Sequence, residues 1–349
     1  MESNRSNRIL YFDFLKIISA LAVILIHVCG ESDVWNNNDY ANPQWNIICL
    51  FMTLSRFSVP VFFMISGSLL LNNPEKYSIK RIFTHNIFHI VTALLFWSAF
   101  YTVADKLIFN PAASPMDMLN QLITGKVHMW YIFTLLLFYM ITPLLHKIVE
   151  NKSLERYFIL LYLIPAVYGF SQFFISIPIV NNLYKNFGFA ASYLIYYVSG
   201  HYFYKYEIKK SRRYVIYALG ILSLAATVLM SEILPKKGIA SAYTIGDRLN
   251  INIYLISVAV FVFAKYASAR INLSEKITRP VSWVSRQLTF GIYLIHYFFV
   301  ELAYKKGWLN VGVNVSSLYI PLLVLLFFIV SAAAIFVVSR IPVLKKYVI

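Results

Sequence analysis

Apolar stretches of about 20 residues, long enough to cross a bilayer as an α-helix, recur along nearly the whole chain. Charged residues make up only 13% of the 349 residues, whereas soluble proteins usually carry about 25%. We therefore expect an all-α polytopic membrane protein, with residues 1–349 forming a single integral-membrane domain. The expected transmembrane helices lie near residues 10–30, 45–71, 84–105, 128–146, 157–180, 188–204, 214–234, 250–268, 287–304 and 317–341.

The distribution of Lys and Arg supports about ten spans. If the N-terminus lies in the cytoplasm, roughly two thirds of the 31 basic residues fall in inner segments and about a quarter in outer ones. This alternation predicts that both ends of the chain are cytoplasmic. Topology thus accounts for the net charge of +16, and no nucleic-acid partner is expected. The longest outer segment, about 106–127, is expected to be a loop.

Several other classes of site and signal are disfavoured by the sequence. Residues 1–30 have a basic start and an apolar run, but no A-x-A-type cleavage site follows, so we expect an uncleaved first span. Cys29 and Cys49 lack metal-ligand spacing and are expected to be buried thiols, so no metal site is predicted. The chain has no P-loop, dinucleotide-binding, nucleophile-elbow or H-E-x-x-H motif.

The first span carries four ionisable residues, namely Asp13, Lys16, His27 and Glu31. The eleven-residue step from Lys16 to His27 is three helical turns plus roughly 20°, so both side chains lie on one face, about 16 Å apart along the axis. Ionisable groups within a span normally face protein or a water-filled cavity. We therefore expect the rest of the chain to enclose this face.

Two readings of these residues remain open at this point. Asp13 and Lys16 could form an ion pair at i, i+3, with Lys16 snorkelling inward, and His27 could be an interfacial histidine with satisfied hydrogen bonds. Alternatively, His27 is a general base, since an imidazole has a pKa near 7, and Glu31 one turn further orients it.

The second span places Arg56 and Ser66 on either side of Pro60. Proline has no N–H to donate to the carbonyl of Arg56, so the helix should kink there. A guanidinium is costly in a membrane. Arg56 is therefore either a structural partner of a carboxylate or, as we favour, a binder of an oxyanion or carboxylate.

Histidines also occur in the fourth and ninth spans. His128 lies beside Trp130 at a depth similar to that of His27, and His296 lies near mid-membrane. Trp130 alone would be an ordinary interface anchor. Four further histidines lie at inner ends of spans and are expected to be structural: His85, His89, His146 and His201.

Four motifs carry a resemblance to a known family: DFLKIISALAVILIH (residues 13–27), SRFSVPVFFMISGSLLL (55–71), HMWYIFTLLLFYMITPLL (128–145) and FGIYLIH (290–296). Together they resemble the membrane acyltransferase-3 family of bacterial O-acyltransferases, and most closely the type that O-acetylates enterobacterial common antigen or related exopolysaccharides. Lys16 and His27 hold the positions of the family's basic residue and histidine. Arg56 matches its second-helix arginine, and His128 the start of its H-x-W stretch.

The resemblance implies an enzyme of the bacterial inner membrane that transfers an acyl group from cytoplasmic acetyl-CoA, or another acyl-CoA, to a sugar hydroxyl of a surface or lipid-linked glycan. No permanently bound cofactor is expected. His27 would be the general base, Arg56 would stabilise the oxyanion, and Glu31 would assist. The substrates and acyl-CoA would be bound by the remaining polar residues of the motifs, which are Asp13, Lys16, Ser66, His128, Trp130 and His296.

Four alternatives stay open. Acyl transfer could pass through an acyl-histidine. The acyl group could be succinyl, whose second carboxylate would pair with Arg56 or the outer Lys236, Lys237 and Arg248. The protein could instead be a glycan or lipid transporter, or a sensor without turnover, although no repeat between halves is detected.

Overall fold

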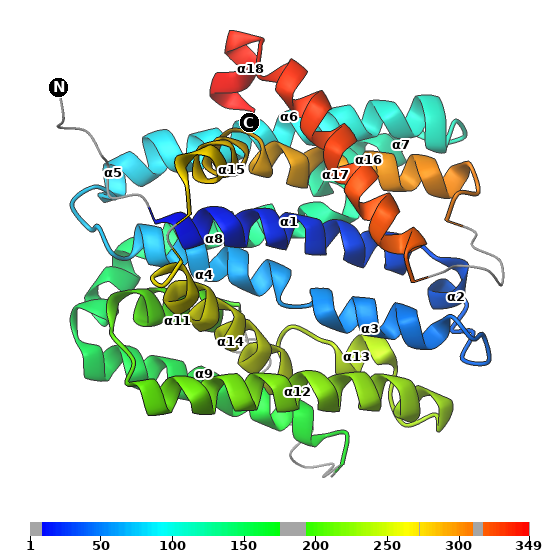
Figure 1. The fold of residues 1–349 in the computed structure, drawn as a ribbon. Helices are drawn as coiled ribbons and strands as arrows, with labels where there is room; N and C mark the ends of the chain where they lie inside the picture. Colours follow the sequence, from blue (N-terminus) through cyan, green and yellow to red (C-terminus); the bar gives the residue numbers. More distant parts are fainter. Residues whose placement is uncertain (1–8, 175–192, 272, 310–316, 349) are drawn as a thin grey trace.

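The computed structural model describes residues 9–174, 193–271, 273–309 and 317–348, and all secondary structure within these ranges is helical. Figure 1 shows the longer helices side by side in one bundle. The prediction of an all-α membrane protein is confirmed.

The helices fall into two runs along the described chain. The first run is α1 (Leu10–Gly30), α2 (Asp33–Asn36), α3 (Trp45–Ser55), α4 (Ser58–Leu70), α5 (Ile79–Arg81), the π-helix η1 (Ile82–Ile87), α6 (Phe88–Ala104), the π-helix η2 (Asp105–Phe109), α7 (Pro115–Thr124), the 3₁₀ turn η3 (Val127–Met129), α8 (Trp130–Glu150) and α9 (Lys152–Ser171). The second run is α11 (Leu194–Lys205), α12 (Lys210–Lys236), α13 (Ala242–Ile245), α14 (Ile251–Ser268), α15 (Glu275–Gln287), α16 (Thr289–Lys305), α17 (Tyr319–Val338) and α18 (Pro342–Tyr347).

Seven helical stretches within the described residues are long and apolar enough to cross a membrane: Leu10–Gly30, Trp45–Leu70, Ile79–Phe109, Pro115–Glu150, Lys210–Lys236, Ile251–Ser268 and Tyr319–Val338. The other three expected spans correspond to α9, α11 and α16, which are helical but fall short of these criteria. Parts of the spans expected at 157–180 and 188–204 lie outside the described residues. The count of ten and the orientation stay predictions.

Helix α1 is the centre of the bundle. It contacts α3 and α4 on one side and α15, α16 and α17 on the other, and it also packs against α14 (Figure 1). Twelve of its 21 residues are buried. This enclosure gives the polar side chains of the first span the protein surroundings that a membrane cannot offer.

The second span is interrupted as the sequence predicts. Helix α3 ends at Ser55 and α4 begins at Ser58, so the break falls at Arg56 and Phe57, just before Pro60. Both residues at the break keep right-handed helical dihedral angles, and the hydrogen-bond ladder resumes with Val61, whose N–H donates to the carbonyl of Phe57 at 2.9 Å. The missing N–H of proline is the physical reason.

Helices α4 and α11 cross at two glycines. A Cβ at Gly67 would lie 1.8 Å from the carbonyl oxygen of Tyr197, and a Cβ at Gly200 would lie 2.0 Å from that of Met64. Both distances are too short for a carbon–oxygen contact, so a side chain fits at neither glycine. The backbones of α4 and α11 are therefore in direct contact at Gly67 and Gly200. Small residues at a crossing are a common way for membrane helices to pack closely.

The prediction of a loop at about 106–127 was wrong for most of this segment, which is helical. Residues 105–109 continue the preceding helix as η2, and α7 occupies residues 115–124. Ser114 is the N-cap of α7 and forms a capping box with Asp117. Pro115 occupies the first helical position. These are strong helix-start signals, and they outweigh the loop-like composition of the preceding residues.

The glycine crossing yields a stability prediction. We expect Gly200→Ala to destabilise the protein by about 1–3 kcal/mol, because the added methyl group forces α4 and α11 apart. Thermal unfolding of the purified protein in detergent measures this. Gly30→Ala is the control, since a Cβ added at Gly30 would have no other atom within 4 Å. Equal melting temperatures for the two variants would contradict the crossing.

Candidate active site

Three histidines from distant parts of the chain meet near the C-terminal end of α1. His27 comes from the last turns of α1, His128 from η3 just before α8, and His296 from α16. The ring centroid of His27 lies 6.2 Å from that of His128 and 5.2 Å from that of His296, and the rings of His128 and His296 are 5.2 Å apart. The similar depth expected for His27 and His128 therefore corresponds to a real contact.

Backbone carbonyls fix two of these imidazoles. Nε2 of His128 lies 3.1 Å from the carbonyl oxygen of Leu294, and Nδ1 of His296 lies 2.7 Å from that of Tyr293. Because a carbonyl only accepts, each of these nitrogens carries a proton in the neutral ring. The opposite nitrogens, Nδ1 of His128 and Nε2 of His296, are then acceptors, and both are buried without a hydrogen-bond partner among the described residues.

Accessibility distinguishes His27 from its two neighbours. His128 is 1% exposed and His296 is fully buried, whereas His27 is only half-buried. A bound molecule can therefore reach His27 more readily than the other two rings.

A tyrosine connects the histidines to an acidic residue. The ring of Tyr297 packs edge-on against His27 at 5.0 Å and stacks on His128 at 5.3 Å. Its hydroxyl donates a hydrogen bond of 2.6 Å to Oε1 of Glu31. Tyr297 thus lies between Glu31 and His27, and the orienting role expected for Glu31 stays a prediction.

A charge network lies beside the histidines. Nζ of Lys126 is 2.8 Å from an oxygen of Asp105 and 2.8 Å from Oε1 of Glu301, and these side chains are only 14–22% exposed. The ammonium group of Lys126 also lies 5.9 Å from the ring centroid of Tyr297. One cation therefore holds two carboxylates from η2 and α16 together, next to the ring that packs on His27.

Two arginines form the other side of the site. Arg56 at the α3–α4 break is 3% exposed, and its Nη2 is buried without a hydrogen-bond partner among the described residues. Arg248 lies just before α14, and its Nε is also buried without a hydrogen-bond partner among the described residues. Its guanidinium lies 5.1 Å from the ring centroid of Trp130. Both positive charges act on His27. Trp130 therefore serves as a platform for a cation in addition to its place at the start of α8.

A pocket of about 380 Å³ opens toward the other end of α1. Lys16 and Ser66 line it together with His89 and Arg286, and the binding role expected for Lys16 and Ser66 stays a prediction. Lys16 and Arg286 give the pocket a positive charge. His89, which we expected to be structural, belongs to this lining.

Tyr293 joins the pocket to the histidines. It lines the pocket, its ring lies 5.8 Å from both His128 and His296, and its hydroxyl donates to the carbonyl of His128. The residues that line the pocket and the histidine cluster therefore share a wall on α16. The Lys16 and His27 ends of the first span belong to one continuous set of contacts.

Asp13 of α1 lies against α15. It is buried, and its carboxylate accepts hydrogen bonds from Ser282 and, at 2.8 Å, from Ser285 of α15. It does not line the pocket of Lys16. These contacts fasten α1 to α15, and its role in acyl-CoA binding stays a prediction.

Two of the histidines expected to be structural have structural contacts. Nε2 of His146 lies 3.0 Å from the carbonyl oxygen of Leu70, and Nδ1 of His201 lies 2.7 Å from Oε1 of Glu155. His85 is exposed on η1. Within the described residues, no group of three His, Cys, Asp or Glu side chains is arranged to hold a metal ion.

The sequence reasoning missed several residues of the site, above all Tyr293, Tyr297 and Lys126. The two tyrosines flank His296 at i−3 and i+1, and this spacing was a usable signal. Lys126 gave none, because its partners Asp105 and Glu301 are 21 and 175 residues away.

A family model described as an acyltransferase domain, acyltransferase-3, matches residues 9–340. The match covers nearly the whole chain and includes every site residue described above. Comparisons with curated proteins and with solved structures gave no match.

The Lys126 network yields a second stability prediction. Lys126→Met should destabilise the protein by about 1–3 kcal/mol, less than the ~3–5 kcal/mol of a fully buried pair, because it leaves Asp105 and Glu301 facing each other. Thermal unfolding measures the effect. Lys147→Met removes an exposed ion pair with Glu150 and should change little. Similar losses in the two variants would mean that the network contributes no more than a surface pair.

Proposed function

The chain belongs to the membrane acyltransferase-3 family, and we propose that it transfers an acyl group, most simply acetyl, from acyl-CoA to a hydroxyl group of a surface or lipid-linked glycan. Membership of the family makes it a membrane acyltransferase. The donor, the acceptor, the bacterial inner membrane as its location and the roles of individual residues are our proposal.

The observation that carries the proposal is a group of buried polar atoms that lack partners. Nη2 of Arg56, Nε of Arg248, Nδ1 of His128 and Nε2 of His296 are all buried without a hydrogen bond among the described residues. Buried polar groups in native proteins nearly always have partners. Two cationic donors and two imidazole acceptors around half-buried His27 suit a polar substrate that is bound and then deprotonated.

In the proposed reaction, His27 takes the proton from the acceptor hydroxyl. The resulting oxygen attacks the thioester carbonyl, a new C–O bond forms, and the C–S bond to CoA breaks. The CoA thiolate leaves with the electron pair of that bond, and the proton held by His27 neutralises it. His27 is our choice because it is the accessible ring of the three.

The arginines suit the charge that develops during this step. The carbonyl oxygen becomes negative when the tetrahedral intermediate forms, and a preorganised donor in a water-poor site stabilises it strongly. Arg56 has such a donor, and Arg248 lies nearby to bind an anion or to support Arg56. A succinyl group would bring its own carboxylate to the same two arginines, which makes it the second candidate acyl group.

The pocket at Lys16 suits the donor. CoA carries phosphates that Lys16 and Arg286 would attract, and the pantetheine arm would extend toward Tyr293. The distance of about 16 Å along α1 between Lys16 and His27 is comparable to an extended pantetheine. In this arrangement Ser66 would contact the arm, and the thioester would reach the histidines.

The assignment of His27 predicts that His27→Ala abolishes acyl transfer while the protein still inserts and folds, because His128 and His296, the other two rings of the cluster, are enclosed by protein. The measurement is transfer of label from acetyl-CoA to membrane glycan by purified protein. His85→Ala, which removes an exposed histidine, is the control and should keep full activity. Retained activity in His27→Ala would overturn the assignment, and movement of glycan without transfer of label would favour a transporter.

The role of Arg56 predicts a different kinetic signature. Arg56→Gln should lower kcat by about 10²–10³-fold, because it removes one donor to the oxyanion. Arg56→Lys should recover only part of this loss, since an ammonium lacks the planar fork of a guanidinium. If Arg56→Gln raises KM and leaves kcat unchanged, Arg56 binds substrate and does not stabilise the transition state.

A further inference from the structure

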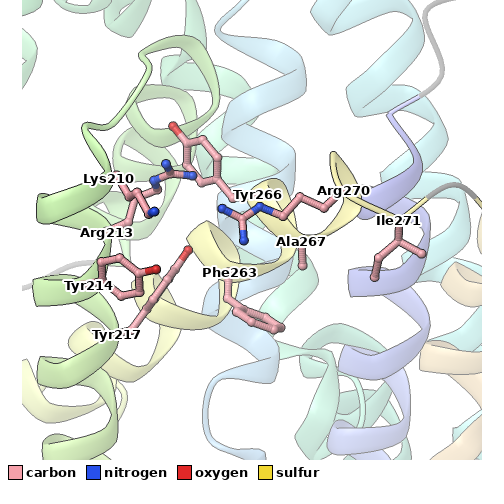
Figure 2. Close-up of a pocket in the computed structure, with 9 residues that line it drawn as sticks. All are labelled: Lys210, Arg213, Tyr214, Tyr217, Phe263, Tyr266, Ala267, Arg270 and Ile271. Carbon is pink, nitrogen blue, oxygen red and sulfur yellow. The ribbon is translucent and has the colours of Figure 1, made fainter.

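A second pocket lies between α12 and α14 and contains none of the residues of the candidate active site. Its volume is about 370 Å³, and it shares no lining residue with the pocket of Lys16. Its residues come from the start of α12, from the end of α14 and from Arg270 and Ile271 just after it (Figure 2). The proposed acyl transfer makes no use of it.

Three cationic side chains gather at this pocket, namely Lys210, Arg213 and Arg270. Figure 2 shows their nitrogen atoms in the space between the two helices. The guanidinium of Arg213 lies 4.0 Å from the ring centroid of Tyr266, and its Nε is buried without a hydrogen-bond partner among the described residues. Three positive charges in so small a space favour the binding of an anion.

The carboxylate beside the pocket is already engaged. Oε2 of Glu207 accepts a hydrogen bond of 2.7 Å from the hydroxyl of Tyr266, and Oε1 lies 3.1 Å from Nζ of Lys265. The hydrogen bond from Tyr266, with Lys265 adding to it, holds the pKa of Glu207 below its ordinary value. Glu207 is therefore ionised and paired with Lys265, and it also attracts Arg213. One carboxylate faces four cations, so Lys210, Arg213 and Arg270 keep an excess of positive charge.

The other half of the pocket is apolar and faces outward. Phe263 is 61% exposed and Ile271 is 54% exposed. Tyr214 and Tyr217 line the α12 side of the pocket, and the hydroxyl group of Tyr217 points toward the cationic side chains (Figure 2). In a membrane, such exposed apolar groups contact lipid chains. The pocket thus combines cationic groups, tyrosine hydroxyl groups and exposed apolar side chains, which suit the phosphate and the acyl chains of a phospholipid.

We propose that this pocket binds one anionic phospholipid, with the phosphate between Arg213 and Arg270 and an acyl chain along Phe263 and Ile271. The distribution of Lys and Arg predicts that this end of α12 and α14 faces the cytoplasm, where anionic lipids attract basic residues. A phosphate of CoA has the same headgroup chemistry, but it would leave the outward apolar half uncovered. The proposal is independent of acyl transfer.

Native mass spectrometry of the delipidated full-length protein tests the proposal. The protein is titrated in detergent with phosphatidylglycerol, with phosphatidylcholine of the same chains, and with free CoA. We expect one phosphatidylglycerol to bind in preference to the other two probes. The double variant R213Q/R270Q should bind it about 30-fold more weakly, because two basic contacts are lost. The matched control K345Q/K346Q, which removes two exposed charges from α18, should bind like the unaltered protein.

Two further variants keep the test decisive. Loss of Arg213 could disturb Tyr266, whose ring it contacts, so R270Q is also tested alone. R270Q removes only an exposed side chain and should still weaken binding severalfold. R213K/R270K keeps both positive charges and should retain most of the affinity. Equal binding of phosphatidylglycerol by R213Q/R270Q and the unaltered protein would overturn the proposal. Arginine-dependent binding of free CoA, without preference between the two lipids, would assign the pocket to a soluble phosphate instead.

Discussion

The structure depends on the cost of placing ionisable side chains within an apolar helix. Helix α1 carries a carboxylate, a lysine and a histidine in a span that would otherwise suit the bilayer core, and a membrane offers these groups no partners. The bundle meets this constraint by enclosing α1 between α3 and α4 on one side and α15, α16 and α17 on the other. Asp13 is held by two serines of α15, Lys16 lines a pocket, and His27 packs against other aromatic rings of the bundle.

The same constraint organises the candidate site. Lys16 lines a positively charged pocket toward one end of α1, and His27 joins two other histidines toward the opposite end. Tyr293 of α16 belongs to both groups. An acyl donor bound at one end and an acceptor bound at the other would therefore meet along a single helix, which is an economical way to carry out transfer across a membrane.

The sequence was sufficient for features that depend on local periodicity and failed for those that depend on distant contacts. Helical spacing placed Lys16 and His27 on one face, and Pro60 predicted the interruption at Arg56. Helix α7 replaces most of the expected loop because Ser114 and Pro115 start a helix, although the composition of residues 110–114 is typical of a loop. Lys126 could not be predicted, since its partners come from segments as far as 175 residues away. The burial of Asp13 against α15 required the tertiary structure for the same reason.

The sidedness of the reaction tests the central claim most directly. Purified protein is reconstituted in vesicles in one known orientation, with labelled acetyl-CoA on one side of the membrane and the glycan acceptor on the other. The account predicts labelled glycan only when the acetyl-CoA is on the side of Lys16 and the acceptor is on the side of His27. Labelling that requires donor and acceptor on the same side would contradict transfer along α1.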